Sequence, residues 1–231
     1  MNAIEIRGLE KHYPGFDLRL DLDLPQGCIL GLIGENGAGK STTIKSILGM
    51  IRPDAGSITV LGRDNSKNFA PVREDIGVVL DEGGLPQCLN AAQLGRVMSG
   101  IYRNWDQAVY EDYLKKLSLP KDKAYKDFSR GMKMKQAIAV ALSHHPKLLV
   151  LDEPFVGLDP KATFTLKEIM HEMCKEGTAI FFSTHVLDVA EKLCNKVAII
   201  KQGKIIAAGT MEELTGNQSL EEVFLEVEDE K

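Results

Sequence analysis

The sequence has no apolar run that approaches the ~20 residues of a membrane-spanning helix. Its first residues, MNAIEIRGLEKHYPG, place Glu5 early and lack the apolar centre of a secretory signal. We therefore expect a protein that stays in the cytoplasm. If it works at a membrane, we expect another chain to supply the membrane-spanning part.

Cysteine is scarce as well. The four cysteines, Cys28, Cys88, Cys174 and Cys194, are widely separated and form no CxxC pair. This pattern argues for reduced cytosolic thiols and against a zinc site. The formal net charge of −5 provides no general attraction for nucleic acid, so we expect no nucleic-acid partner.

What is present suits a globular α/β chain. Alternating apolar and polar residues in AIEIRGL and FDLRLDLDL predict antiparallel strands joined near Pro14-Gly15. KVAIIKQGKIIAAGT predicts a hairpin with a turn at Gln202-Gly203. Three apolar runs predict buried strands: GCILGLIG, KLLVLDEP and TAIFFSTH. Residues 85–145 are mostly helical in pattern and contain His144 and His145, which precede a proline and are expected to be solvated.

The segment GENGAGKST, Gly34–Thr42, fits G-x-x-x-x-G-K-[ST]. It follows a predicted buried strand and precedes a predicted helix, the context in which this motif binds phosphate. Glycine lets the backbone curl with its N–H groups pointing inward, lysine reaches the β- and γ-phosphates, and Ser41 can ligate Mg²⁺. The nucleotide-binding residues expected here are Gly34, Asn36, Gly37, Ala38, Gly39, Lys40, Ser41 and Thr42.

Two adjacent carboxylates end the apolar run LLVLDEP. Because ligands bind at the carboxyl edge of a parallel sheet, we expect Asp152 to hold Mg²⁺ and Glu153 to polarise an attacking water.

With these motifs in order, the sequence resembles the ATP-binding subunits of ABC transporters from about Ile4 to Leu225. The resemblance also includes GLDP (Gly157–Pro160), similar to the family's D-loop, and STH, whose His185 matches the switch histidine. FSRGM (Phe128–Met132) stands where the family has its LSGGQ signature. A GTPase is disfavoured, because NKVA at 195–198 lacks the aspartate of a guanine-reading NKxD.

The resemblance implies a P-loop NTPase with a RecA-like core, an antiparallel β lobe and a helical signature subdomain. On this basis we interpret the chain as one ABC ATPase domain, with residues 1–84 and 146–231 forming the core and β lobe and 85–145 the helical subdomain. Two subunits would pair head to tail around two ATP and Mg²⁺, and would drive a separate membrane permease from the inner face of the membrane. SLEEVFLE and the signature resemble stand-alone subunits of bacterial drug, peptide or lipid exporters.

Individual roles follow from the resemblance, and some stay open. Tyr13 matches the aromatic that stacks on adenine, although a tyrosine packed in a turn is the plain alternative. His185 is expected to contact the γ-phosphate. Asp159 can serve both as a turn former before Pro160 and as a contact across the dimer.

Two positions depart from the family pattern. Asp81 stands where the family has its Q-loop glutamine, and Gln87 is too far along to replace it. In the signature, Arg130 and Met132 replace glycine and glutamine, while Ser129 and Gly131 remain to meet a γ-phosphate across the dimer.

The segment around Ser129 also raises a question of charge. Arg130, Lys133 and Lys135 crowd the start of a predicted helix, where the helix dipole favours anions. A γ-phosphate from the opposite subunit would supply the anion, with Arg130 either supporting it or facing solvent.

Two other functions use a phosphate loop. A soluble ABC-type ATPase could act on ribosomes or DNA, but such relatives generally carry two cassettes or long coiled-coil inserts. A small-molecule kinase would leave FSRGM and GLDP unexplained.

Overall fold

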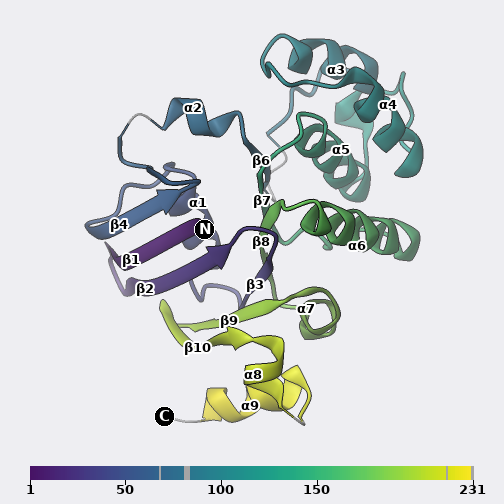
Figure 1. Cartoon of the computed structure of the whole chain (residues 1–231). Helices are drawn as coiled ribbons and strands as arrows, with labels where there is room; N and C mark the ends of the chain where they lie inside the picture. Colours follow the sequence, from purple (N-terminus) through teal and green to yellow (C-terminus); the bar gives the residue numbers. More distant parts are fainter. Residues whose placement is uncertain (68, 81–83, 217, 230–231) are drawn as a thin grey trace.

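The computed structural model describes residues 1–67, 69–80, 84–216 and 218–229. Within these ranges the strands form one mixed sheet in the order β5-β4-β1-β2-β10-β9-β3-β8-β7-β6 (Figure 1). The strands are β1 (Asn2–Tyr13), β2 (Phe16–Pro25), β3 (Ile29–Ile33), β4 (Ala55–Val60), β5 (Arg63–Asp64), β6 (Ile76–Val79), β7 (Leu148–Asp152), β8 (Ala179–Thr184), β9 (Lys196–Lys201) and β10 (Lys204–Thr210). The α-helices are α1 (Lys40–Ile47), α2 (Ala70–Arg73), α3 (Ala91–Ser99), α4 (Gln107–Lys116), α5 (Arg130–Leu142), α6 (Pro160–Lys175), α7 (Leu187–Leu193), α8 (Met211–Thr215) and α9 (Leu220–Asp229).

The two predicted hairpins are confirmed. β1 and β2 pair antiparallel with Tyr13 opposite Phe16, and β9 and β10 pair antiparallel around Gln202-Gly203. Both turn residues have positive φ, as a two-residue hairpin turn requires. Alternation along β2 buries Leu18, Leu20, Leu22 and Leu24. The antiparallel strands therefore form a half-buried lobe at one end of the sheet.

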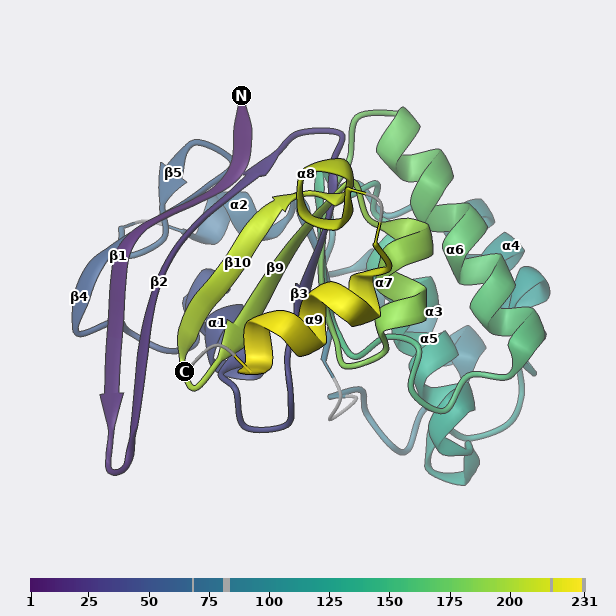
Figure 2. The same ribbon diagram turned by 90° about the horizontal axis from the view of Figure 1, so that it is seen from below.

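The parallel part of the sheet is covered on both faces. β3 pairs in parallel with β8 and β9, and β7 pairs in parallel with β8 and β6. Every residue of β3, β7 and β8 is buried, which explains their continuous apolar sequences. Figure 2 shows α1 with the antiparallel strands on one side of β3, and α5, α6 and α7 on the other.

The helices of residues 85–145 do not have a core of their own. Tyr110 of α4 is fully buried, donates its hydroxyl to the Ala91 carbonyl at 2.8 Å and accepts from Gln136. Burial raises the pKa of Tyr110 to about 12. The apolar side chains around it belong to the same cluster as Leu149, Leu151 and Phe182 of the sheet. The helical segment therefore shares one apolar core with strands β7 and β8.

Among the described residues, no helix has the length and apolar character needed to cross a membrane.

His144 differs from the sequence expectation of a solvated loop residue. It is 0% exposed, its ring stacks on Tyr102 with centroids 4.0 Å apart, and its Nε2 lies 3.2 Å from the Ile76 carbonyl oxygen. The turn after α5 presses it against β6, whereas His145, with positive φ, points outward. The local sequence could not predict that His144 is buried and His145 exposed, because this difference arises from the packing of α5 on β6.

Burial lowers the pKa of His144 below its ordinary value. The folded state holds the neutral ring, so the unfolded state takes up a proton as pH falls below about 6.5 and stability is lost. We expect up to about 1.4 kcal/mol less stability from this residue at one pH unit below 6.5. Thermal melting at pH 7.5 and 5.5 measures the effect.

The variant His144→Phe keeps the stacked ring without the titration, so its melting temperature should depend less on pH than that of the wild type. The exposed neighbour provides the control, because His145→Gln should leave the wild-type pH dependence largely in place. Equal pH dependence in wild type and His144→Phe would contradict the assignment.

Candidate nucleotide-binding site

The phosphate loop occupies the turn between β3 and α1. Gly37 and Gly39 have φ values of 85° and 115°, which side chains rarely adopt, so the loop needs glycine at both positions. At Gly34 the reason is space, because a Cβ there would lie 2.3 Å from the Ile200 carbonyl oxygen of β9. Close packing on β9 and left-handed backbone together curl residues 34–42 into a loop.

Lys40, the first residue of α1, is only 6% exposed. Its ammonium donates to the carbonyl oxygens of Gly34 and Glu35, at 2.7 and 3.1 Å, and lies 3.3 Å from Glu153 Oε1. A buried ammonium needs such partners, because an unpaired charge in the interior is costly. The charge of the Lys40 ammonium is therefore balanced by one carboxylate and two carbonyl oxygens of the loop.

The acidic pair ends β7 as predicted. Asp152 is the last residue of the strand and is 5% exposed, and Glu153 follows it with a strained φ of 48°. In the register of β7 and β8, Asp152 lies opposite Ser183. The Ser183 hydroxyl donates to Asp152 Oδ1 at 2.5 Å and accepts from the backbone N–H of Glu153 at 3.0 Å. One buried serine thus fixes both acidic residues.

Ser183 was missed by reasoning from the sequence, although a signal exists. It is the first polar residue in the apolar run of β8. A polar side chain that is buried in a strand usually has a hydrogen-bond partner nearby.

His185 lies just beyond β8, and its Nδ1 is 3.0 Å from Glu153 Oε2. The two oxygens of Glu153 therefore face different cations or donors: Lys40 on one side and His185 on the other. The His185 side chain is 49% exposed, whereas that of Glu153 is 16% exposed. The structure brings Lys40, Glu153 and His185 together.

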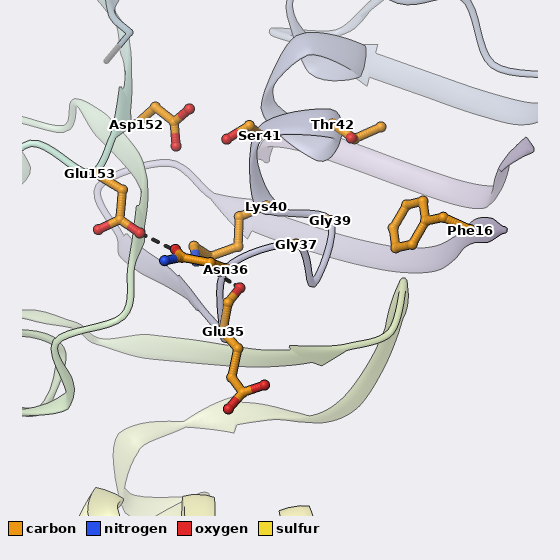
Figure 3. A pocket seen from close by; sticks show the side chains of 10 residues that line it. All are labelled: Phe16, Glu35, Asn36, Gly37, Gly39, Lys40, Ser41, Thr42, Asp152 and Glu153. Carbon is orange, nitrogen blue, oxygen red and sulfur yellow. Dashed lines mark hydrogen bonds and ion pairs between the residues drawn. The ribbon is translucent and has the colours of Figure 1, made fainter. Parts of the chain in front are cut away.

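Figure 3 shows the cavity that these elements enclose, with the acidic pair at one end and Phe16 at the other. Its volume is about 300 Å³. The lining residues are Phe16, Glu35, Asn36, Gly37, Gly39, Lys40, Ser41, Thr42, Asp152 and Glu153. Backbone N–H groups at the start of α1, a buried ammonium and a hydroxyl make this cavity suited to phosphate groups.

The same cavity contains oxygen donors that suit Mg²⁺. The Ser41 hydroxyl and the Asp152 carboxylate both line it, and Mg²⁺ prefers a few carboxylate or hydroxyl oxygens completed by substrate phosphates. In the described part of the chain, no cluster of three or more His, Cys, Asp or Glu side chains could hold a metal ion. A cation bound at Ser41 and Asp152 would therefore depend on further ligands from phosphate or water.

Several predicted residues lie outside this cavity. Tyr13, Ser129, Gly131 and Asp159 are absent from its lining. Asp81, the substitute for the Q-loop glutamine, lies outside the described residues. The chain thus brings together the phosphate loop, the acidic pair and His185, and keeps the signature segment elsewhere.

The signature segment begins α5 and packs against the D-loop of the same chain. Ser129 is exposed and caps α5 by accepting from the N–H of Met132 at 3.2 Å. At Gly131, a Cβ would lie 2.3 Å from the Gly157 carbonyl oxygen. Glycine is therefore required here by contact with the D-loop within the chain.

The cations at the start of α5 have partners in the chain itself. Lys135 forms an ion pair with Asp159, and the Lys133 ammonium lies 5.5 Å from the centroid of the Tyr125 ring. Asp159 also caps α6, accepting from the N–H of Ala162 at 2.8 Å. Its pKa is lowered, mainly by the hydrogen bond from Lys135. The cations at this helix start were expected to meet an anion, and for Lys135 that anion is the Asp159 carboxylate of the D-loop.

Residues 18–156 match the family described as "ABC transporter". This span covers the phosphate loop, the signature segment and the acidic pair. The chain belongs to the ABC transporter family.

Relatives and solved structures agree with this membership. Daunorubicin/doxorubicin resistance ATP-binding protein DrrA of Streptomyces peucetius is 36% identical over 92% of this chain and 66% of its own. Bacitracin transport ATP-binding protein BcrA of Bacillus licheniformis is 36% identical over 81% of this chain and 62% of its own. A solved ATP-binding subunit of an ABC transporter is 31% identical, with a TM-score of 0.91, and the match covers 98% of this chain and all of that one.

The chain spans less than two thirds of the length of either curated relative. The predicted family, the α/β P-loop NTPase fold and the ATPase class are confirmed by these likenesses. What these longer relatives transport and which chains they assemble with do not follow for this chain from the matches.

We expect Ser183→Ala to lower the rate of ATP hydrolysis by about 10- to 100-fold, because Asp152 and Glu153 lose the hydroxyl that fixes them. The size of the effect is that seen when a hydrogen-bond partner of a metal ligand is removed. ATP affinity in the absence of Mg²⁺ should change little, since the hydroxyl does not line the cavity. Steady-state hydrolysis and calorimetric binding measure the two effects.

Ser143→Ala is the matched control, because that buried hydroxyl donates to the Ala139 carbonyl of α5 and is not part of the acidic pair's surroundings. A Ser183→Ala chain that melts like the control and hydrolyses ATP at the wild-type rate would contradict the positioning role.

Proposed function

We propose that this chain hydrolyses ATP as the nucleotide-binding subunit of a transporter, in a dimer that encloses two ATP molecules and drives a separate membrane permease. The observation that carries the proposal is the cavity at the end of β3. There a phosphate loop, a buried lysine and the two carboxylates at the end of β7 lie around one cavity. Family membership supports the same reading.

Within the cavity, the residues divide the work by charge and reach. The N–H groups of residues 36–42 and the Lys40 ammonium hold the phosphates, with Lys40 exchanging its carboxylate partner for γ-phosphate oxygens. Glu153 then polarises the attacking water, and His185, 3.0 Å away, orients that carboxylate and the γ-phosphate. Asp152 and Ser41 would hold Mg²⁺, which would neutralise charge on the β- and γ-phosphates.

The dimer is proposed because one chain does not complete the site. Ser129 is exposed and Gly131 half-buried at the start of α5, and neither lines the phosphate cavity of its own chain. In a head-to-tail pair, the Ser129 hydroxyl and the Gly131 N–H meet the γ-phosphate of the opposite subunit. Asp159, through Lys135, links this helix start to the D-loop that leads back to Glu153.

We expect Glu153→Gln to bind ATP with near wild-type affinity, to lose hydrolysis by about 100-fold or more, and to accumulate as an ATP-bound dimer. The amide keeps the shape of the side chain but cannot act as a base. Light scattering with ATP and a phosphate-release assay measure the two outcomes.

Glu172→Gln, an exposed change on α6, is the control and should behave as wild type. An unchanged hydrolysis rate in Glu153→Gln would rule out this role for the carboxylate.

An apolar groove supports the proposal that a membrane protein docks on this chain. It has a volume of about 350 Å³ and is lined mainly by apolar groups, including Met50, Phe69 and Tyr102. Met50 and Ile101, the neighbour of Tyr102, are each 60% exposed. Exposed apolar patches of this kind mark protein contacts. Ile76 and Val78 of β6 also line the groove, and β6 pairs with β7, the strand that ends in Asp152.

We propose that the permease docks in this groove and that the complex lies at the inner face of the membrane. We propose that the transporter exports a drug, peptide or lipid. The names of two relatives, which refer to daunorubicin/doxorubicin resistance and bacitracin transport, support a drug or a peptide as the substrate class.

Affinity purification of the tagged chain from detergent-solubilised cells should recover one integral membrane protein in stoichiometric amount. Met50→Glu should lose it while retaining ATP hydrolysis, because the substitution places a charge in the apolar groove without touching the phosphate cavity. Glu172→Gln again serves as the control. Co-sedimentation with ribosomes instead of a membrane protein would favour the soluble ABC-type alternative.

A further inference from the structure

The ring of His185 must keep one direction if it is to orient Glu153. Its Nδ1 lies 3.0 Å from Glu153 Oε2, but the side chain is 49% exposed, so packing around the ring does not hold it in place. His185 also lies one residue beyond the end of β8, where the hydrogen-bond ladder of the strand has stopped. The backbone of residues 184–186 is therefore what aims the ring at the carboxylate.

A buried threonine fixes this backbone. Thr184, the last residue of β8, is 1% exposed, and its Oγ1 accepts from the backbone N–H of Val186 at 3.0 Å. A threonine side chain that bonds the N–H two residues further along closes a tight turn around the residue between them. That residue is His185. The Thr184 hydroxyl thus closes the turn from which the histidine projects.

The same hydroxyl serves the start of α7. Val186 is the N-cap residue of this helix, its side chain has no polar atom, and it makes no side-chain cap hydrogen bond. A partly buried N–H without an acceptor is costly, and Thr184 supplies the acceptor for the N–H of Val186. The turn that carries His185 is therefore tied to β8 before it and to α7 after it.

Thr184 and its neighbour Ser183 have separate tasks. Successive side chains of a strand point to opposite faces of the sheet, so the two hydroxyls do not compete for one partner. The Ser183 hydroxyl accepts from the backbone N–H of Glu153 at 3.0 Å. Two successive residues of β8 thus serve the two members of one contact: Ser183 holds Glu153, and Thr184 directs His185 toward it.

We propose that Thr184 is a positioning residue for ATP hydrolysis, which acts through His185 and does not touch the nucleotide. Thr184 is absent from the lining of the phosphate cavity, and its Oγ1 faces the Val186 N–H. Without this acceptor the turn relaxes, and the His185 ring loses its direction toward Glu153. The inference rests on the proposed function, because it takes His185 to orient the Glu153 carboxylate and the γ-phosphate.

The test replaces the hydroxyl by a methyl group of similar size. In the full chain, Thr184→Val should lower kcat for ATP hydrolysis by about 10-fold and leave KM for ATP within about twofold, because a small misplacement of a catalytic group costs rate and not binding. Thr184→Ser restores the acceptor, so its kcat should lie within about threefold of the wild-type value. Phosphate release at varied ATP concentration measures both constants.

A double-mutant cycle with His185→Ala separates positioning from a general structural role. Once the imidazole is removed, loss of the Thr184 hydroxyl has no ring left to misplace. Thr184→Val should therefore change the rate by less than about twofold in the His185→Ala background, whereas a general weakening of the fold lowers the rate in both backgrounds alike. Single-turnover phosphate release measures the low rates, and melting curves without ligand accompany each variant.

Thr178→Val is the matched control. Thr178 immediately precedes β8, at the opposite end of the strand from His185, and its hydroxyl donates to the Pro146 carbonyl at 3.3 Å. The same exchange of hydroxyl for methyl at this position should leave kcat and KM at their wild-type values.

Three outcomes would overturn the inference. A wild-type kcat in Thr184→Val would show that the hydroxyl has no part in hydrolysis. An equal loss in the wild-type and His185→Ala backgrounds would make Thr184 a structural residue only. A Thr184→Ser chain as slow as Thr184→Val would place the effect in the packing of the methyl group.

Failure of the proposed function gives different results. A His185→Ala chain that hydrolyses ATP at the wild-type rate would contradict the role of the histidine and remove the inference with it. A wild-type chain that hydrolyses no ATP would contradict the proposed function as a whole. Neither result resembles a change that is confined to the Thr184 variants.

Discussion

The balance of charge around the Lys40 ammonium is the interaction on which the site depends. An ammonium that is 6% exposed must be compensated, and two carbonyls of its own loop and the Glu153 carboxylate do this. The same contacts bind α1 to the end of β7. Under the proposed function, a phosphate in the cavity would compete with Glu153 for Lys40, so nucleotide binding would also release the carboxylate.

The second constraint is backbone contact at glycine. Gly34 packs on β9 and Gly131 packs on the D-loop, and in both places a side chain would collide with a carbonyl oxygen at 2.3 Å. These contacts hold the phosphate loop against the sheet and the signature helix against the loop that follows Glu153. The sequence suggested that the cations of α5 await a phosphate, yet Lys135 already has Asp159 as its partner. A phosphate across a dimer would then add to an existing ion-pair link, and would not be the only anion near this helix start.

Much of the fold was predictable because its signals are local. The left-handed turn at Gln202-Gly203, the alternation of β2 and the apolar runs of β3, β7 and β8 each reflect a few consecutive residues. The phosphate loop and the acidic pair were predictable for the same reason. His144 was not: a histidine in a turn is usually solvated, and only the packing of α5 against β6 buries it beside Tyr102.

The sequence by itself determined the class of chemistry, because the spacing of Gly34, Lys40 and Ser41 dictates how a backbone can wrap phosphate. Tertiary structure decided which side chains line the cavity beside that loop. The register of β7 and β8 places Ser183 opposite Asp152, and of the two aromatic residues beside the β1–β2 turn Phe16, not Tyr13, lines the cavity. Residues separated by some twenty to thirty positions meet only when the sheet is assembled, so their spacing along the chain does not reveal their contact.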